Sequence, residues 1–170
     1  MKYGNIILIG MTGSGKSTVG VKLAERLGWT FVDTDQRVVA LAGKTISEIF
    51  AEHGEPYFRQ LETEVVRSVL EQREQVVATG GGVVLAEANR QAMKDNGIVI
   101  QLYTAIETIA ERLRGNVNRP LLQGGVEERL RLLAEQRKHA YDFADLIIDT
   151  SQCTPEEIVS RIIGELEQLM

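Results

Sequence analysis

A glycine-rich stretch near the start of the chain has the residue types and spacing of a phosphate-binding loop. Its pattern, Gly-x-x-x-x-Gly-Lys-Ser from Gly10 to Ser17, follows an apolar run and opens a helical pattern, the context that the motif requires. The glycines let successive backbone N–H groups turn toward phosphate oxygens, and the helix N-terminus adds partial positive charge. In such a loop Lys16 reaches the β- and γ-phosphates, and the Ser17 hydroxyl binds Mg²⁺. The motif predicts a nucleoside triphosphate but leaves the phosphoryl acceptor open.

Two aspartates at the end of the next apolar stretch have the spacing of a paired acidic site. Asp33 and Asp35 close an expected strand at residues 30–33, and on an extended chain side chains two residues apart point to the same side. Adjacent like charges are unfavourable unless a cation lies near them. A bound Mg²⁺, together with a substrate hydroxyl, would explain why two carboxylates are placed side by side. The alternative is an acidic turn that caps the following helix, because Asp is a good N-cap. The residues alone leave both interpretations open.

Three consecutive glycines, Gly80–Gly82, directly follow the expected strand at residues 75–79. Glycines cost chain entropy and add nothing to a core, so they are typical of places where the backbone must closely approach a ligand. Open α/β sheets bind ligands at the C-terminal ends of their strands, which is where these glycines lie. The alternative is a flexible turn.

Two arginines have positions that suit anion binding. Arg59 and Glu62 have i,i+3 spacing on an expected helix, so Glu62 could hold Arg59 toward an anion, although spacing alone favours a surface ion pair. Arg119 lies in the polar, Gly-rich stretch 115–125, beside Pro120, which favours an extended conformation at the arginine. That composition fits a loop over the phosphate site, and an ordinary exposed loop is the alternative.

The elements that must position these residues alternate along the chain. Apolar runs suited to buried parallel strands occur at residues 5–10, 30–33, 75–79, 98–102 and 146–149. Helical patterns occur at 16–27, in pieces between 36 and 70 interrupted near 43 and 54–56, at 87–96, 106–113 and 126–141, and after the capping box at 154–157, with a last apolar stripe of Ile158, Ile162, Leu166 and Leu169. This alternation predicts an α/β fold with helices on both faces of a sheet. The three motifs that follow strands should therefore meet at one sheet edge.

The bulk composition fits one globular domain of 170 residues, with 44% hydrophobic and 25% charged residues. A net charge of −5 argues against a surface built for nucleic acid. Positive charge is nevertheless concentrated in one segment, which contains Arg112, Arg114, Arg119, Arg129, Arg131, Arg137 and Lys138. The single Cys153 can form no internal disulfide. Because no apolar run has the length of a membrane span or the form of a signal peptide, we expect a cytoplasmic location and no membrane partner.

Five motifs in order give the chain a wider resemblance. They are residues 10–18, Asp33-Thr-Asp35, Phe58-Arg59-Gln-Leu-Glu62, Gly80–Gly82, and Arg119-Pro120-Leu-Leu followed by Arg137-Lys-His-Ala-Tyr141. With these motifs the chain resembles the shikimate kinase family, in the nucleoside-monophosphate-kinase-like P-loop group. The resemblance implies a three-layer α/β/α fold with a five-stranded parallel sheet in the order 2-3-1-4-5. We expect a single domain, 1–170, with an acceptor-binding segment at about 34–62 and a lid at about 113–125. A monomer is also expected.

The same resemblance implies phosphorylation of the 3-hydroxyl of shikimate by ATP, a step toward chorismate and the aromatic amino acids. The catalytic residues would be Lys16, Asp35 and Arg119. The ATP-binding residues would be Gly13, Ser14, Gly15, Lys16, Ser17, Thr18, Arg112 and Arg119. Arg112 would stack on adenine, and residues 152–155 match an adenine-binding loop in position only. Mg²⁺ would be held by Ser17 and, through water, by Asp33.

The resemblance also assigns the acceptor side of the site. Asp35 would bind the ring hydroxyls and act as a base or orient the attacking oxygen. Arg59 and Arg137 would bind the shikimate carboxylate, and Gly80–Gly82 would contact the acceptor through backbone N–H groups. Arg119 on the lid would neutralise the transferred phosphoryl group. On this basis Arg59 and Glu62 are interpreted as a functional pair rather than a surface ion pair.

Three other functions are weighed against this one. A gluconate-type kinase shares a similar P-loop but gives no account of Asp33, Asp35, Arg59 and the triple glycine together. A GTPase is disfavoured because the chain contains no Asn-Lys-x-Asp sequence and no Asp followed three residues later by Gly. A non-catalytic nucleotide-binding module has no visible support, since the charged residues of the expected site are all present.

Overall fold

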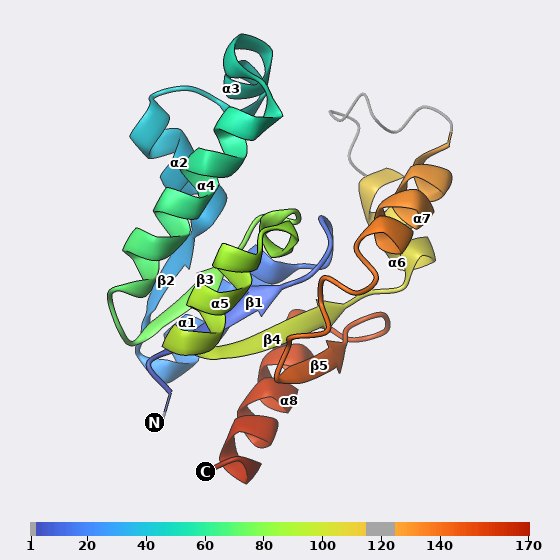
Figure 1. Cartoon of the computed structure of the whole chain (residues 1–170). Helices are drawn as coiled ribbons and strands as arrows, with labels where there is room; N and C mark the ends of the chain where they lie inside the picture. The colour runs from blue at the N-terminus through green and yellow to red at the C-terminus, as the bar shows by residue number, and fades with distance from the viewer. Residues whose placement is uncertain (1–2, 115–124) are drawn as a thin grey trace.

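A parallel β-sheet forms the centre of the chain in a computed structural model that describes residues 3–114 and 125–170. Its five strands are β1 (Asn5–Ile9), β2 (Thr30–Asp33), β3 (Gln75–Ala78), β4 (Ile98–Tyr103) and β5 (Leu146–Asp149). They lie in the order β2-β3-β1-β4-β5, and all neighbouring pairs are parallel (Figure 1). The predicted strand order is therefore confirmed.

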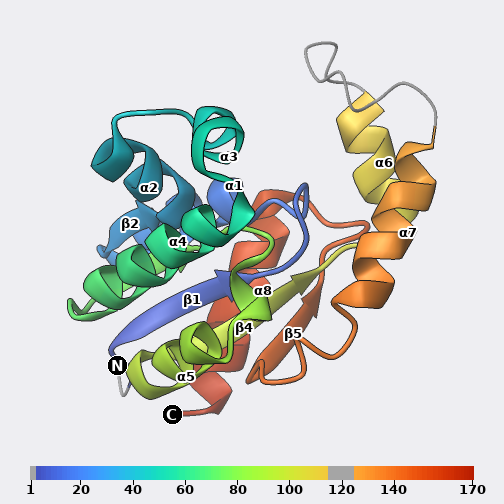
Figure 2. The same cartoon turned by 45° about the horizontal axis from the view of Figure 1, so that its top comes forward.

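Helices cover both faces of the sheet, so the predicted three-layer architecture is also confirmed. On one face, α1 (Lys16–Leu27) and α8 (Pro155–Gln168) pack against the even-numbered residues of β1, Ile6 and Leu8. On the other face, α4 (Glu55–Leu70) and α5 (Glu87–Asn96) pack against Ile7 and Ile9 (Figure 2). Because successive side chains of a strand alternate between faces, the run Ile6–Ile9 is buried on both sides.

The stretch between β2 and β3 folds as three helices, as its glycine interruptions predict. After α2 (Thr34–Ala42) comes Gly43 with φ 67°, and α3 (Ile46–His53) ends at Gly54 with φ 81°. The Thr45 side chain accepts a hydrogen bond from the Glu48 N–H and so caps α3. A short 3₁₀ turn, η1 (Val83–Leu85), follows the triple glycine.

Helices α6 (Ile106–Arg114) and α7 (Val126–Gln136) pack against each other at one side of the sheet (Figure 2). Their contact has its own small apolar cluster, made of Ile109, Ala110, Val126 and Leu130. Met11 of the glycine-rich loop packs against both this cluster and the main core, so it links the helix pair to the body of the protein. Most of the expected lid, including Arg119, lies outside the described residues.

The prediction of one long helix over residues 126–141 is wrong. α7 ends at Gln136, and Arg137 follows as its C-cap with φ −100° and ψ 3°. Tight turns continue from there, with the Ala140 N–H bonded to the Arg137 carbonyl and the Ala144 N–H to the Tyr141 carbonyl. Burial of Tyr141 in the main core draws the chain away from the helix axis, so tertiary packing overrides the local helical pattern.

The last helix also departs slightly from its predicted stripe. Ile158, Ile162 and Leu166 are buried, but Leu169 is 44% exposed and lies just beyond the helix end. The predicted capping box is present, with reciprocal hydrogen bonds between Thr154 and Glu157. None of the helices among residues 3–114 and 125–170 has both the length and the apolar character needed to cross a membrane.

Candidate active site

Three neighbouring strands end level with one another and bring the predicted motifs together. Asp33 of β2 pairs with Ala78 of β3, which pairs with Leu8 of β1. The glycine-rich loop, the Asp-x-Asp pair and the triple glycine all follow from these three positions. Residues from all three motifs line one cavity of about 380 Å³, formed by Thr12, Gly13, Gly15, Lys16, Ser17, Thr18, Asp33, Asp35, Thr79, Gly80 and Gly81.

The glycine-rich loop curls tightly between β1 and α1. Gly15 has φ 89° and precedes the first residue of the helix, a conformation that L side chains rarely adopt. Gly10 lies so close to β4 that an added Cβ would be 2.6 Å from the Leu102 carbonyl oxygen. The N-terminus of α1 opens into the cavity, so its N–H groups are available to phosphate oxygens.

The Lys16 ammonium folds back onto its own loop. Its Nζ donates hydrogen bonds to the carbonyl oxygens of Gly10, at 2.6 Å, and Met11, at 2.9 Å. The residue is only 8% exposed. Burial lowers the pKa of Lys16 from 10.5 to about 8, with Arg137 acting in the same direction and Asp35 and Asp33 opposing it. A phosphate group would have to draw Nζ away from these carbonyls, and its negative charge would favour the protonated amine.

Asp33 has two roles at once, one structural and one facing the cavity. Its Oδ1 caps α2 by accepting hydrogen bonds from the N–H groups of Asp35 and Gln36, and its Oδ2 accepts a 2.8 Å hydrogen bond from Ser17. The prediction that the Asp33–Asp35 pair lies on an extended chain is wrong, because Thr34 already begins α2. Both aspartates nevertheless line the cavity, so the capping interpretation and the site interpretation apply together.

Asp35 lies against the first glycine of the triple-glycine segment. A Cβ added to Gly80 would be 2.7 Å from Asp35 Oδ1. The Gly80 N–H donates to the Thr34 hydroxyl at 3.2 Å, which fixes this glycine against the start of α2. Burial raises the pKa of Asp35, the neighbouring Asp33 raises it further, and Lys16 and Arg59 work in the opposite direction.

Arg59 is held by a buried carboxylate and packs on the third glycine. Its Nη1 is 2.9 Å from Glu62 Oε1, and the Glu62 side chain is 1% exposed. Arg59 also reaches the exposed Glu55 at 3.4 Å. Burial raises the pKa of Glu62, whereas the hydrogen bond and the charge of Arg59 lower it. A Cβ on Gly82 would be 2.4 Å from Arg59 Nη2, so the guanidinium occupies the space that a side chain would fill.

Arg137 reaches the second glycine from the far side of the site. A Cβ on Gly81 would be 3.2 Å from Arg137 Nη1 and 2.9 Å from Thr12 Oγ1. The three glycines are therefore contacted in turn by Asp35, Arg137 and Arg59. None of the three has a positive φ, so glycine is favoured there because a Cβ would collide with the ends of these side chains.

The remaining predicted residues are placed less completely. Arg112 on α6 is exposed, and its Nη1 donates to the Gly13 carbonyl at 3.1 Å, which brings it to the edge of the glycine-rich loop. The turn after β5 adjoins the end of β4, where Ser151 accepts a hydrogen bond from the Ala105 N–H at 2.9 Å. Arg119 lies outside the described residues.

Three threonines of the site were not predicted from the sequence. Thr34 holds Gly80, and Thr12 contacts Gly81. Thr79, 5% exposed, lines the cavity while its hydroxyl donates to the Leu8 carbonyl at 2.8 Å. Thr34 stands between the two aspartates and Thr79 directly precedes the triple glycine, so proximity to a motif was the one available signal. A lone threonine carries no spacing pattern of its own.

Comparison with known proteins gives one consistent family. The family model described as shikimate kinase matches residues 12–167. The shikimate kinase of Thermodesulfovibrio yellowstonii is 44% identical over 97% of this chain and 96% of its own length. That of Persephonella marina is 46% identical over 95% of this chain and 98% of its own length. The solved structure of the Acinetobacter baumannii shikimate kinase in complex with shikimate superposes with a TM-score of 0.91 at 38% identity, covering 98% of this chain and 94% of that one.

The expected strand order, the family model and the near full-length matches agree with one another. This chain belongs to the shikimate kinase family.

Proposed function

We propose that this chain transfers the γ-phosphoryl group of ATP to the 3-hydroxyl of shikimate, giving shikimate 3-phosphate. Membership of the shikimate kinase family supports the reaction. One observation carries the residue assignment: the side chains of Asp35, Arg137 and Arg59 meet at Gly80–Gly82, beside the glycine-rich loop. This puts one carboxylate and two guanidinium groups next to the phosphate cradle. Such a set suits a small acceptor that has both hydroxyl groups and an anionic group.

The acceptor carboxylate is assigned to the two arginines. A guanidinium binds a carboxylate through parallel charge-assisted hydrogen bonds, which fix both position and orientation. Glu62 would orient Arg59 for this task through the 2.9 Å contact. The backbone N–H groups of the glycines between Arg59 and Arg137 would act as further donors to the acceptor.

Asp35 is assigned to the hydroxyl that attacks the phosphoryl group. Its carboxylate accepts a hydrogen bond from that hydroxyl and orients the oxygen toward the γ-phosphate. The raised pKa of Asp35 makes it a better proton acceptor than an ordinary surface carboxylate. Phosphoryl transfer depends mainly on positioning and charge stabilisation, so orientation is the larger part of this role.

Nucleotide phosphates are assigned to the glycine-rich loop and the start of α1. Gly13, Ser14, Gly15, Ser17 and Thr18 offer backbone or hydroxyl donors, and Lys16 supplies a positive charge once it leaves the loop carbonyls. Because this positive charge lies in a largely buried position, it interacts strongly with the transferred group once Nζ has moved from the loop carbonyls to the phosphates. Arg112 and Arg119 are proposed as further ATP contacts, Arg112 on adenine and Arg119 on the transferred phosphoryl group.

Ser17 and Asp33 fit the requirements of a Mg²⁺ site. Their oxygens are 2.8 Å apart at the cavity wall, and Mg²⁺ prefers one or two protein oxygens completed by waters and substrate phosphates. No group of three His, Cys, Asp or Glu side chains suited to a metal occurs among residues 3–114 and 125–170, which agrees with a metal that binds together with the nucleotide. When bound there, Mg²⁺ would neutralise charge on the β- and γ-phosphates.

The acceptor-binding segment at about 34–62 and the lid at about 113–125 belong to the same proposal. α2 carries Asp35, and α4 carries Arg59 and Glu62. Together with α3, which lies between them in the chain, these helices would enclose the acceptor. The adenine loop at 152–155, the monomeric state and the cytoplasmic location stay predictions from the sequence.

The proposed reaction is tested by measuring ADP release from Mg²⁺-ATP with shikimate, with gluconate and without acceptor. We expect turnover with shikimate alone. Turnover with gluconate would keep a kinase but reject the acceptor assignment. If protein that still binds ATP releases no ADP in any of the three reactions, the proposed function is rejected in favour of a non-catalytic nucleotide-binding module.

A further inference from the structure

Tyr141 is a buried residue to which the proposed reaction gives no role. Its side chain is 7% exposed, and its hydroxyl oxygen has no hydrogen-bond partner among residues 3–114 and 125–170. The Nε atom of Arg137 is likewise buried and without a partner in that part of the chain. Burial raises the pKa of the Tyr141 phenol, and the nearby positive charge of Arg137 works in the opposite direction. Arg137 and Tyr141 lie on one tight turn, in which the Ala140 N–H bonds to the Arg137 carbonyl, so a single turn carries both buried groups that lack a partner.

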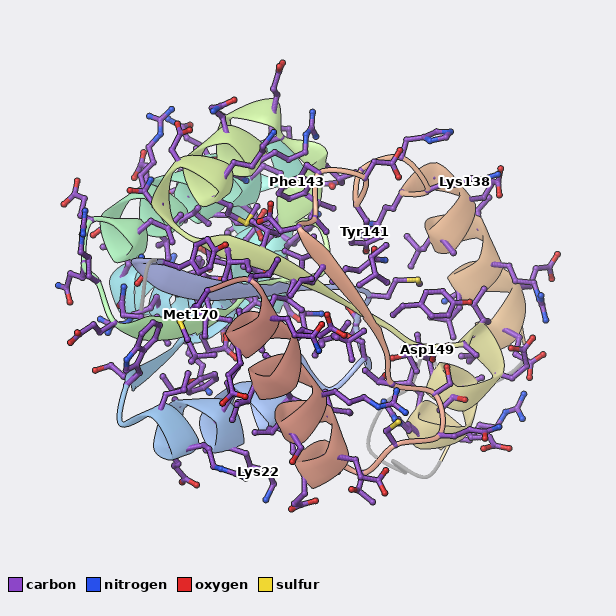
Figure 3. The ribbon with its side chains drawn as sticks, turned by 90° about the horizontal axis from the view of Figure 1, so that it is seen from below. Lys22, Lys138, Tyr141, Phe143, Asp149 and Met170 are labelled. Atoms are coloured by element: carbon purple, nitrogen blue, oxygen red, sulfur yellow. The ribbon has the colours of Figure 1, made fainter. Side chains whose placement is uncertain are left out.

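The position of Tyr141 in the chain connects Arg137 to the core. Arg137 caps α7, and α7 packs against α6 in a small cluster separate from the main core. Four residues later, the Tyr141 ring packs in the main core with Ile7 of β1 and Val99 of β4. Figure 3 shows Tyr141 between Lys138, just beyond the end of α7, and Phe143, on the segment that leads to β5. Tyr141 therefore fixes the far end of the turn that carries Arg137.

The hydroxyl of Tyr141 is not explained by packing. A phenylalanine ring would fill nearly the same volume in the core. It would also avoid the destabilising effect of a buried oxygen that has no hydrogen-bond partner. The Arg137 guanidinium has five N–H donors, and an acceptor carboxylate takes two of them. A remaining N–H could donate to the phenol oxygen and so fix the plane of the guanidinium.

We propose that Tyr141 is a positioning residue, whose hydroxyl holds the Arg137 guanidinium in the orientation that binds the acceptor carboxylate. The inference rests on the proposed function, because it assumes that Arg137 binds the acceptor. It assigns Tyr141 to acceptor affinity and not to the fold or to ATP binding.

The test is Tyr141→Phe, with Tyr103→Phe as the matched control. Tyr103 lines the same apolar cavity of about 240 Å³ as Tyr141, together with Met11 and Leu102. It is 48% exposed, and it belongs to neither half of the proposed site. Each variant loses one hydroxyl from a tyrosine that lines this cavity. The measurements are KM for shikimate, KM for ATP, kcat and the thermal midpoint.

We expect Tyr141→Phe to raise the shikimate KM by about three- to tenfold, the loss typical of one hydrogen bond. The ATP KM and kcat should stay within about twofold of the unsubstituted enzyme. The thermal midpoint of the acceptor-free enzyme should stay the same or rise, because the hydroxyl that is removed has no hydrogen-bond partner among the described residues when no acceptor is bound. Tyr103→Phe should change none of the kinetic constants. A merely structural hydroxyl would give the opposite pattern, with a lower midpoint and an unchanged shikimate KM, and that result would overturn the inference.

Arg137→Ala separates this inference from the proposed function. If Arg137→Ala raises the shikimate KM and Tyr141→Phe does not, the role of Tyr141 is rejected and Arg137 keeps its assignment. If Arg137→Ala itself leaves the shikimate KM unchanged, the acceptor assignment of Arg137 fails. The double variant should match Arg137→Ala alone, because a hydroxyl that acts through Arg137 has no further effect once the arginine is absent. Additive effects would contradict the inference.

Discussion

Replacement of Gly82 by alanine is the most direct perturbation of the acceptor pocket. Its backbone, with φ −96° and ψ 3°, is open to alanine, so the substitution adds no backbone strain. The new Cβ would, however, lie 2.4 Å from Arg59 Nη2. Ordinary van der Waals contact begins at 3.4 Å, so the guanidinium must retreat by about 1 Å, the difference between these two distances.

The cost of that retreat should fall on acceptor binding more than on folding. The guanidinium is the end of a flexible side chain and can keep its contact with the exposed Glu55, so we expect a loss of about 1 kcal/mol in unfolding free energy. That corresponds to roughly 2–4 °C in thermal midpoint for a chain of this size. A displacement of 1 Å in a positioning group can cost about a hundredfold in rate, so kcat/KM for shikimate should fall about ten- to a hundredfold.

The assay is steady-state ADP release with shikimate varied at saturating ATP and then ATP varied at saturating shikimate. The matched control is Gly164→Ala in α8, where an added Cβ has nothing within 4 Å and should stabilise the helix by about 0.5–1 kcal/mol. A Gly82→Ala enzyme with an unchanged kcat/KM for shikimate would refute the idea that Arg59 must lie against this glycine. Equal losses for ATP and shikimate would indicate general misfolding instead.

Three further predictions follow from the charged groups of the site. Asp35→Asn should lower kcat by roughly 10²–10⁴ with little change in ATP affinity. The same variant should raise the thermal midpoint at pH 7.5 more than at pH 4. The reason is that the folded-state pKa of Asp35 is raised, so the contribution of this carboxyl group to stability falls as the pH rises through that pKa. Calorimetry at both pH values checks the sign. ATP binding should be accompanied by proton uptake on the Lys16 amine at about pH 8.5 and by almost none at pH 6.5, because the pKa of Lys16 in the free protein is about 8. Titration calorimetry in buffers of different ionisation enthalpy measures this uptake. Zero uptake at the higher pH would contradict the prediction. Arg137→Ala should raise the shikimate KM by about ten- to a hundredfold, the worth of a charge-assisted hydrogen bond, and an ATP KM that rises while the shikimate KM does not would show that the arginine is misassigned.

The sheet was predictable because its signals are local. Buried parallel strands appear as short apolar runs, and glycines end the intervening helices at Gly28 and Gly43. The order of the strands came from the family resemblance, since periodicity carries no information about which strands are neighbours. The predicted length of α7 was wrong for the opposite reason. Residues 137–141 contain no helix breaker, and the burial of Tyr141 that ends the helix is a tertiary effect.

The sequence predicted which residues form the site better than it predicted how these residues contact one another. Spacing favoured a surface pair for Arg59 and Glu62, because i,i+3 spacing does not report burial, and Glu62 is in fact 1% exposed. The triple glycine was expected to admit a ligand, yet its immediate neighbours are the side chains of the site itself. Contacts between residues far apart in sequence, such as Gly81 with Arg137, had no signal in spacing or periodicity.

The most direct test of the account is a crystal structure of this protein with shikimate, ADP and Mg²⁺. We expect the shikimate carboxylate between Arg59 and Arg137, the ring over Gly80–Gly82, and the 3-hydroxyl on Asp35, facing the glycine-rich loop. A shikimate molecule bound with its carboxylate on other cationic groups, or with a different hydroxyl on Asp35, would contradict it.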